Sequence, residues 1–275
     1  MRMKSIIRVA KEGVIRHWRR IFLSTLSIAL FVIVWQAYAW YLNANDPGYA
    51  GFIPYPGETA EAFIDSFVTE DPTGLLMTDH IFASLKRISL GFLLAFAIAL
   101  PAGLLMGSNR ICEALGMPIV EIFRPIPPLA WIPIFLVVLG HLWGPVAIVF
   151  LGIFFPILFN VMLGVKRVDP LLIDAARTLG AGRRHMFFKV VLPFTTPYVM
   201  TGIKVGLGIG WMCIVAAEMV GQYGGGVGYY IWNRGEFGHY DYVFAGIAII
   251  AILGILTTGV ASQVERRLYI WMGMK

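Results

Sequence analysis

Long apolar runs recur along this chain, and several of them approach the roughly 20 residues that cross the hydrocarbon core of a bilayer. The runs cover about residues 21–42, 84–107, 116–140, 145–165, 195–220 and 243–264. Charged residues make up 14% of the 275 residues and hydrophobic residues 58%, whereas soluble domains carry about 25% charged residues. One aqueous core cannot bury so many apolar side chains. The sequence therefore predicts an all-α polytopic integral membrane protein with about six transmembrane helices, embedded in the lipid of the cell membrane.

The charged residues are unevenly distributed, and their distribution predicts the topology. Residues 1–20 carry seven Lys and Arg and residues 166–189 carry six, whereas residues 43–79 carry none and have seven acidic residues. Cytoplasmic loops of membrane proteins carry the excess of Lys and Arg. We therefore expect both termini in the cytoplasm and residues 43–79 outside. The net charge of +6 follows from this topology, so no nucleic-acid partner is expected.

Two smaller patterns lie on the expected outer side. Apolar residues within 60–67 recur at helical spacing and predict a short amphipathic helix. Lys86 and Arg87 stand at the start of the second apolar run. Their long stems allow the charged groups to reach the outer interface, so both are expected to snorkel.

A short basic stretch, DAARTLGAGRRHMFFKVVLP, interrupts the apolar runs at residues 174–193. Just before it, Asp169 and Pro170 are typical of a helix N-cap and first helical position. Gly180 is typical of the residue that follows a helix C-terminus. The pattern predicts a helix that starts at Pro170 and ends at this glycine.

A second short helix is expected over about 182–191, with Pro193 as its end. Together the two helices predict a helix–glycine–helix elbow at about 169–193 on the cytoplasmic side. Periodicity alone leaves open that this segment is an ordinary basic loop with an Ala–Gly packing contact.

The same residues resemble the EAA loop of permease subunits of binding-protein-dependent ABC importers. That pattern is Glu-Ala-Ala, three residues, Gly, nine residues and Ile-x-Leu-Pro. The matching positions are Asp174, Ala175, Ala176, Gly180, Val190, Leu192 and Pro193. Asp and Val replace the usual Glu and Ile. Segments such as IPYPGETAEAF and FRPIPPLAWIPIF resemble the nitrate/taurine/sulfonate/bicarbonate branch over about residues 53–265.

The resemblance implies a type I ABC importer permease fold and a transport role. Its partners would be two cytoplasmic ABC ATPases, an extracytoplasmic substrate-binding protein and a second copy of this chain in a homodimer. The cargo would be a small anion of the nitrate, sulfonate/taurine or bicarbonate class. The elbow residues implied to couple to the ATPases are Asp174, Ala175, Ala176, Gly180, Leu192 and Pro193.

The expected organisation has four segments. They are a basic N-terminus with the first transmembrane helix (1–42), an extracytoplasmic acidic loop (43–79), the permease core with its elbow (80–265) and a cytoplasmic tail (266–275).

Motifs for catalysis are missing from the sequence. It has no Gly-x-x-x-x-Gly-Lys-Ser/Thr phosphate loop, its five histidines have no metal-binding spacing, and it has no recognisable nucleophile motif. We expect no catalytic residue, metal or cofactor in this chain, with ATP and Mg bound by the partner ATPase. The glycines within 224–228 are expected to form flexible backbone at the outer end of the fifth span.

Four residues are candidates for lining the translocation path: Glu218, Arg124, Trp131 and Trp211. Ionisable side chains within transmembrane segments are functional candidates by default. Glu218 either lines the path or holds a neighbouring helix through a hydrogen bond. Arg124 either faces an anion or pairs with Glu121, three residues earlier. The two tryptophans either gate the path or pack against other aromatic residues.

Glycines spaced four residues apart, Gly103–Gly107 and Gly202–Gly206–Gly210, favour close helix packing in membranes. They serve either packing within one subunit or a dimer face. A different overall function, a stand-alone secondary transporter or channel, predicts paired ionisable residues in the middle of several spans and leaves the elbow unexplained. A membrane enzyme would need a clustered metal or nucleophile site.

Overall fold

The computed structural model describes residues 2–45, 48, 51–221 and 224–272. These described residues form helices and connecting turns, without a β-strand. The α-helices are α1 (Arg2–Asn45), α2 (Pro56–Asp65), α3 (Met77–Ser108), α4 (Arg110–Phe123), α5 (Ile132–Lys166), α6 (Pro170–Thr178), α7 (Arg183–Met186), α8 (Leu192–Gly221), α9 (Val227–Glu236) and α10 (Tyr240–Trp271). A 3-10 turn, η2 (Pro128–Trp131), precedes α5, and a π-helical turn, η3 (Phe187–Val191), precedes α8.

Five helical stretches of the described chain are long and apolar enough to cross a membrane. They are Ile21–Asn45, Met77–Ser108, Pro128–Lys166, Arg183–Gly221 and Tyr240–Trp271. These stretches contain five of the predicted spans and confirm the polytopic all-α architecture. The amphipathic helix predicted within the acidic loop is also confirmed, as α2.

The third predicted span, about 116–140, is broken and is not a single helix. α4 ends at Phe123 after 14 residues, and the chain then passes through a proline-rich turn before α5. Proline lacks a backbone N–H and crowds the preceding turn, so the consecutive prolines end the helix. Leu136, beyond the break, lies 3.5 Å from the position of a Cβ at Gly221, the C-terminal end of α8. The broken segment therefore still runs the length of the bundle before the chain turns back at Gly140 (φ 73°).

Glycines allow α3 and α8 to pack closely against α5. A Cβ added at Gly103 or Gly107 would lie 2.8 Å from Val161 or Val165 of α5, closer than real Cβ contacts allow. Similar close approaches to α5 occur at Gly202, Gly206 and Gly210 of α8. The four-residue glycine spacing thus serves packing within the subunit, where small residues bring backbones together.

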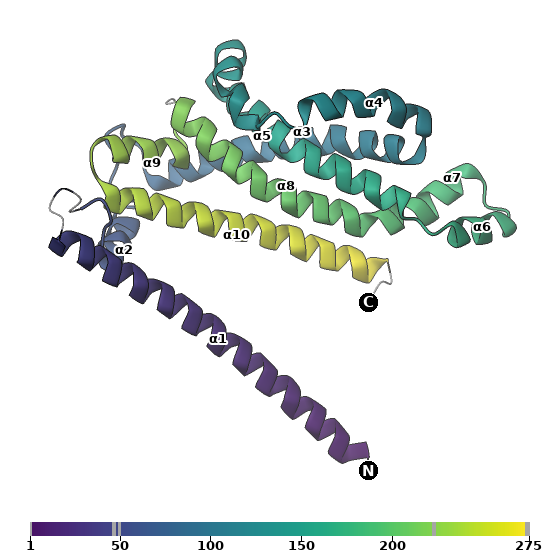
Figure 1. The fold of residues 1–275 in the computed structure, drawn as a ribbon, viewed down its shortest axis with the longest axis horizontal. Coiled ribbons are helices and arrows are strands. Elements are labelled where there is room, and N and C mark those ends of the chain that lie inside the picture. Colours follow the sequence, from purple (N-terminus) through teal and green to yellow (C-terminus); the bar gives the residue numbers. More distant parts are fainter. Residues whose placement is uncertain (1, 46–47, 49–50, 222–223, 273–275) are drawn as a thin grey trace.

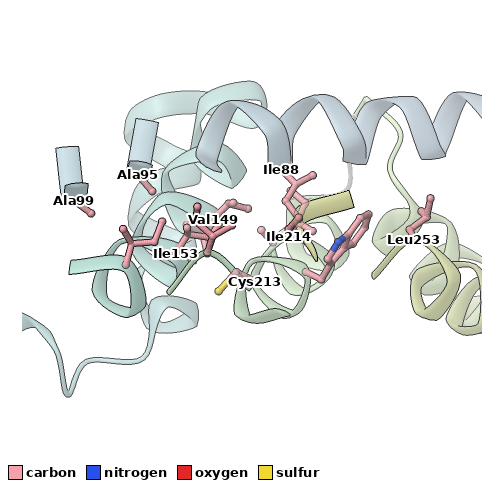
Figure 2. Close-up of a cluster of buried hydrophobic side chains, with 14 of the residues drawn as sticks. Ile88, Ala95, Ala99, Val149, Ile153, Cys213, Ile214 and Leu253 are labelled. Carbon is pink, nitrogen blue, oxygen red and sulfur yellow. The ribbon is translucent and has the colours of Figure 1, made fainter. Parts of the chain in front are cut away.

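The core lies where α3, α5, α8 and α10 meet. Figure 2 shows Ala95 of α3 near Val149 and Ile153 of α5, with Cys213 and Ile214 of α8 nearby. α8 is also joined to α10 through polar groups. Lys204 Nζ lies 2.8 Å from Glu265 Oε2, and Trp211 Nε1 donates to Thr257 Oγ1 at 2.9 Å.

The two ends of the bundle differ. In Figure 1, α6 and α7 project beyond α5 and α8 at the end where α10 finishes, and α9 lies at the opposite end. α1 approaches the core near α2 and diverges from α10 toward its N-terminal end, which lies on the same side as the C-terminus. Trp35 holds the near end of α1, because its ring stacks on Phe244 at 5.5 Å and its Nε1 donates to the Pro54 carbonyl at 3.0 Å. The termini and the elbow therefore share one side, as the charge distribution predicts.

Candidate functional site

The elbow begins and ends through local backbone chemistry. Asp169 is the N-cap of α6, and its Oδ1 accepts a hydrogen bond from the Leu171 N–H at 2.9 Å. At the other end, the Gly180 N–H donates to the Arg177 carbonyl, and the N–H of residue 181 donates to the Ala176 carbonyl. This pair of bonds is a Schellman motif, which requires a left-handed residue. Gly180 supplies it with a φ of 77°, so the predicted start and end of the first elbow helix are confirmed.

The second half of the elbow differs from the prediction. Pro193 does not end a short helix, because α7, η3 and α8 form one continuous helical stretch from Arg183 to Gly221. The π-helical turn η3 ends two residues before the proline, and the Leu192 N–H donates to the Phe187 carbonyl five residues earlier. This wider turn accommodates the proline ring without breaking the helix. The second half of the elbow is therefore continuous with α8.

The elbow exposes apolar side chains that no described residue covers. Leu171 is 72% exposed and Leu179 is 88% exposed. Between them, Asp174 forms an exposed pair with Arg177 at 3.2 Å, and the small side chain of Ala175 is also exposed. Exposed apolar residues rimmed by polar ones mark interaction surfaces. These exposed apolar side chains are typical of an interaction surface, and the assignment of the elbow residues to ATPase coupling stays a prediction.

A second polar site lies at the opposite end of the bundle, between α3, the end of α8 and the start of α9. Arg87 Nη1 lies 2.8 Å from Glu218 Oε1, and both side chains are almost fully buried. The guanidinium also donates to the carbonyls of Gly224 and Gly225, at 3.1 and 2.7 Å. Ser84 Oγ donates to the carboxylate at 2.8–2.9 Å. The prediction that Arg87 snorkels to the interface is wrong, because a buried carboxylate and two carbonyls satisfy its charge within the protein.

The glycines within 224–228 are structural. Gly226 has a φ of 130°, and a Cβ there would lie 2.3 Å from Glu218 Cδ. A Cβ at Gly228 would lie 2.3 Å from the Val215 carbonyl oxygen, and the Gly228 N–H donates to Glu218 Oε2 at 3.1 Å. Close packing against α8 therefore requires glycine at 226 and 228, whereas the flexibility of this backbone stays a prediction.

A histidine and an aspartate extend the cluster toward the acidic loop that precedes α3. His80 Nδ1 accepts from the Gly226 N–H at 3.0 Å, so Nε2 carries the proton that faces Asp71 Oδ2 at 3.2 Å. Burial raises the pKa of Asp71, but hydrogen bonds from Thr73 and the Leu75 N–H lower the pKa more, leaving it below its ordinary value. The carboxylate thereby orients the histidine, which in turn holds the glycine turn.

Sequence reasoning missed His80, Ser84 and Asp71. A signal for the first two exists, since His80, Ser84 and Arg87 are spaced by four and three residues in the sequence. In a helix this spacing aligns side chains on one face, and a polar stripe in an apolar span indicates a polar partner. Asp71 has no comparable signal, because its role depends on where the loop folds.

The four predicted path residues do not form one cluster. Glu218 is 3% exposed and makes the helix-holding hydrogen bonds that one interpretation required. Trp211 is buried and bonded to α10. Trp131 stacks on Phe135, with ring centroids 5.6 Å apart. The guanidinium of Arg124 lies 4.5 Å from the centroid of the Phe159 ring, without the predicted pair to the residue three positions earlier. The assignment of these residues to a path stays a prediction.

The fold defines a multi-pass membrane protein that presents an exposed helical elbow at one end of the bundle. Residues 95–269 match the family described as binding-protein-dependent transport system inner membrane component. The chain therefore belongs to this family of ABC importer permeases.

Individual relatives agree with this assignment. The chain is 40% identical to a putative ABC transporter permease of Methanocaldococcus jannaschii, over 90% of each protein. It is 34% identical to the taurine transport system permease protein TauC of Escherichia coli K12, over 93% of this chain and 91% of TauC. It is 31% identical to the nitrate import permease protein NrtB of Leptolyngbya laminosa, over 88% of this chain and 86% of NrtB.

A solved structure supports the fold. A chain of the inward-facing MetNI methionine ABC transporter superposes with a TM-score of 0.62 at 22% identity, covering 73% of this chain and 99% of that chain. The type I permease architecture expected from the sequence is therefore confirmed.

Proposed function

We propose that two copies of this chain form the translocation path of an importer for a small anion of the nitrate, taurine/sulfonate or bicarbonate class. Two cytoplasmic ABC ATPases dock on the elbows, and an extracytoplasmic binding protein delivers the anion. ATP and Mg are bound by the ATPases, and this chain carries out no covalent chemistry. The names of its relatives in taurine, nitrate and aliphatic sulfonate systems support the substrate class.

The continuous helix from the elbow to the opposite end of the bundle is the observation that carries the coupling proposal. α8 has 30 residues, so it extends about 45 Å at 1.5 Å per residue. The first turn of α8 joins the elbow. Glu218, which pairs with Arg87 in the polar site at the opposite end of the bundle, lies three residues before the last residue of α8. A displacement of the elbow is therefore transmitted to the Arg87–Glu218 site through one continuous helix. This connection suits alternating access, in which ATPase closure at one side changes the opening at the other.

Reconstitution tests this function directly. The purified chain is placed in liposomes with its cognate ATPase and binding protein, and uptake of nitrate, taurine, methanesulfonate and bicarbonate is measured. We expect ATP-dependent uptake of at least one anion only when all three components are present. The chain alone is expected to hydrolyse no ATP, and the assembly is expected to contain two permease and two ATPase subunits by light scattering.

Two results would contradict the proposal. Uptake driven by an ion gradient without the ATPase would identify a stand-alone secondary transporter. A complete assembly that hydrolyses ATP but imports none of the four anions would reject the substrate class while retaining the coupling role.

A further inference from the structure

A cavity of about 330 Å³ lies between the end of α4, the proline-rich break, α5 and α8. Its wall is mostly apolar, with Phe155 and Phe159 of α5 on one side and Val205 and Ile209 of α8 on another. Its polar groups come from two residues, Arg124 and Asn160. The volume is at the small end of the range for ligand sites, which suits an ion of a few heavy atoms better than a large solute.

The cavity lies near the middle of the length of α8. Val205 is 13 residues after the first residue of α8, and Ile209 is 12 residues before the last, counted from Leu192 and Gly221. Both lining residues therefore lie near the middle of the 30-residue helix. A charged side chain near the middle of a membrane span is costly unless it is paired or lines a path.

Arg124, an exposed side chain at the broken span, lacks the carboxylate partner that two cations of the spans have. Arg87 is paired with Glu218, and Lys204 with Glu265, each at 2.8 Å. No carboxylate of the described residues lies within ion-pair distance of Arg124, whose guanidinium instead lies over the Phe159 ring. An aromatic face holds the guanidinium plane without consuming its N–H donors. The N–H groups of the exposed guanidinium are thus left without a carboxylate partner, at the edge of the cavity that Arg124 lines.

Asn160 adds a second donor to the same cavity. Its Nδ2 donates to the Pro156 carbonyl at 2.8 Å, which orients the amide and uses one of its two N–H groups. A guanidinium and an amide N–H are complementary to the oxygens of a planar or tetrahedral oxyanion.

We propose that this cavity is an anion subsite midway along the translocation path, in which Arg124 binds the oxyanion and Asn160 assists. The inference rests on the proposed function and adds the residue that selects for negative charge. Phe155 and the α8 side chains accept the remainder of the ion, such as the carbon atoms of a sulfonate. A single guanidinium without a full cage of donors binds weakly, as a conducting site requires, because tight binding would prevent release.

Charge rescue at one position tests the subsite. The two native cysteines, Cys112 and Cys213, are first replaced by serine and alanine, and this background must retain uptake. Arg124→Cys is then reconstituted with the ATPase and the binding protein. One sample is treated with aminoethyl methanethiosulfonate, which attaches a cationic group, and another with methyl methanethiosulfonate, which attaches a neutral one. The probes for uptake are nitrate, taurine, methanesulfonate and bicarbonate.

We expect Arg124→Cys and Arg124→Gln to lose uptake by about tenfold or more, the effect of one charge-assisted hydrogen bond. Stimulation of ATP hydrolysis by the binding protein is expected to persist, since the elbow is untouched. The cationic reagent is expected to recover most of the uptake and the neutral reagent none. Glu121→Cys, one helical turn earlier and exposed, is the matched control and is expected to respond to neither reagent.

The outcomes separate the subsite from the proposed function. Normal uptake by Arg124→Gln, or equal recovery with both reagents, overturns the subsite while the importer stands. If the wild-type protein imports none of the four anions, the proposed substrate class fails and the subsite fails with it. Loss of assembly with the ATPase in Arg124→Gln would assign the residue a structural role and also overturn the subsite.

Discussion

Replacing Glu218 by glutamine is the sharpest test of the polar site that Arg87 and Glu218 form. The carboxylate lies 2.8 Å from Arg87 Nη1, and the two side chains are 1% and 6% exposed. Glu218→Gln removes the negative charge and leaves the guanidinium buried with only carbonyls and a neutral amide. Removing one partner of a buried pair costs about 3–5 kcal/mol. That is a large part of a total stability of about 5–15 kcal/mol.

The loss is measured as the apparent melting temperature of the purified subunit in detergent. A cost of this size corresponds to a decrease of roughly 10 °C for a chain of this length. Arg87→Gln is expected to have a similar effect, because it leaves the carboxylate unpaired. The double variant is expected to lose less than the sum of the two, by about 1–3 kcal/mol, since no unpaired charge remains. Lys86→Gln, next to the cluster but exposed, is the control and is expected to melt like the wild type.

Two results would refute this reasoning. If both single variants melt at the wild-type temperature, the pair contributes no stability and does not hold α3 against α8. If the double variant is as unstable as the two losses added together, the two side chains act independently and their contact has no coupling energy.

Four further predictions follow from other positions. A Cβ at Gly180 meets no atom within 4 Å, so Gly180→Val adds only backbone strain, about 1–2 kcal/mol at the φ of 77°. The valine variant should retain ATPase binding but lose uptake and stimulated hydrolysis, whereas the control Asp174→Glu should behave like the wild type. Normal coupling in the valine variant would make the elbow an ordinary loop. Gly103→Leu should destabilise the subunit by at least about 1–3 kcal/mol, because its Cβ would lie 2.8 Å from α5; a normal yield and melting temperature would contradict the close packing. The pKa of Asp71 is lowered in the folded protein, so its ionised carboxylate contributes fully to folding stability above the unfolded pKa of about 4, and this contribution is lost as pH falls through the folded pKa. Asp71→Asn should therefore melt at a lower temperature than the wild type at pH 7, and the difference should shrink in acid. A difference that does not change with pH would assign the effect to something other than the charge. Val68, 77% exposed on the outer loop, should as cysteine react with an impermeant thiol reagent added to whole cells, and labelling only after lysis would invert the topology.

The membrane architecture and the elbow could largely be predicted from the sequence. Spans depend on run length, because a bilayer requires about 20 apolar residues wherever they pack. Helix ends depend on neighbouring residues, so Asp169 with Pro170 and the later Gly180 were sufficient to predict α6. Pro193 was misjudged because its effect depends on the hydrogen-bond register before it, and a π-helical turn there accommodates the ring.

The partners of buried polar groups were decided by the tertiary structure alone. Arg87 and Glu218 are separated by 131 residues, and which faces of α3 and α8 meet depends on the glycine contacts of both helices with α5. The sequence identified Glu218 and Arg124 as unusual charges in apolar surroundings but could not say that one is neutralised and the other is not. Hydrophobicity and capping act over a few residues, whereas the pairing of charges is set by helix packing between distant segments of the chain.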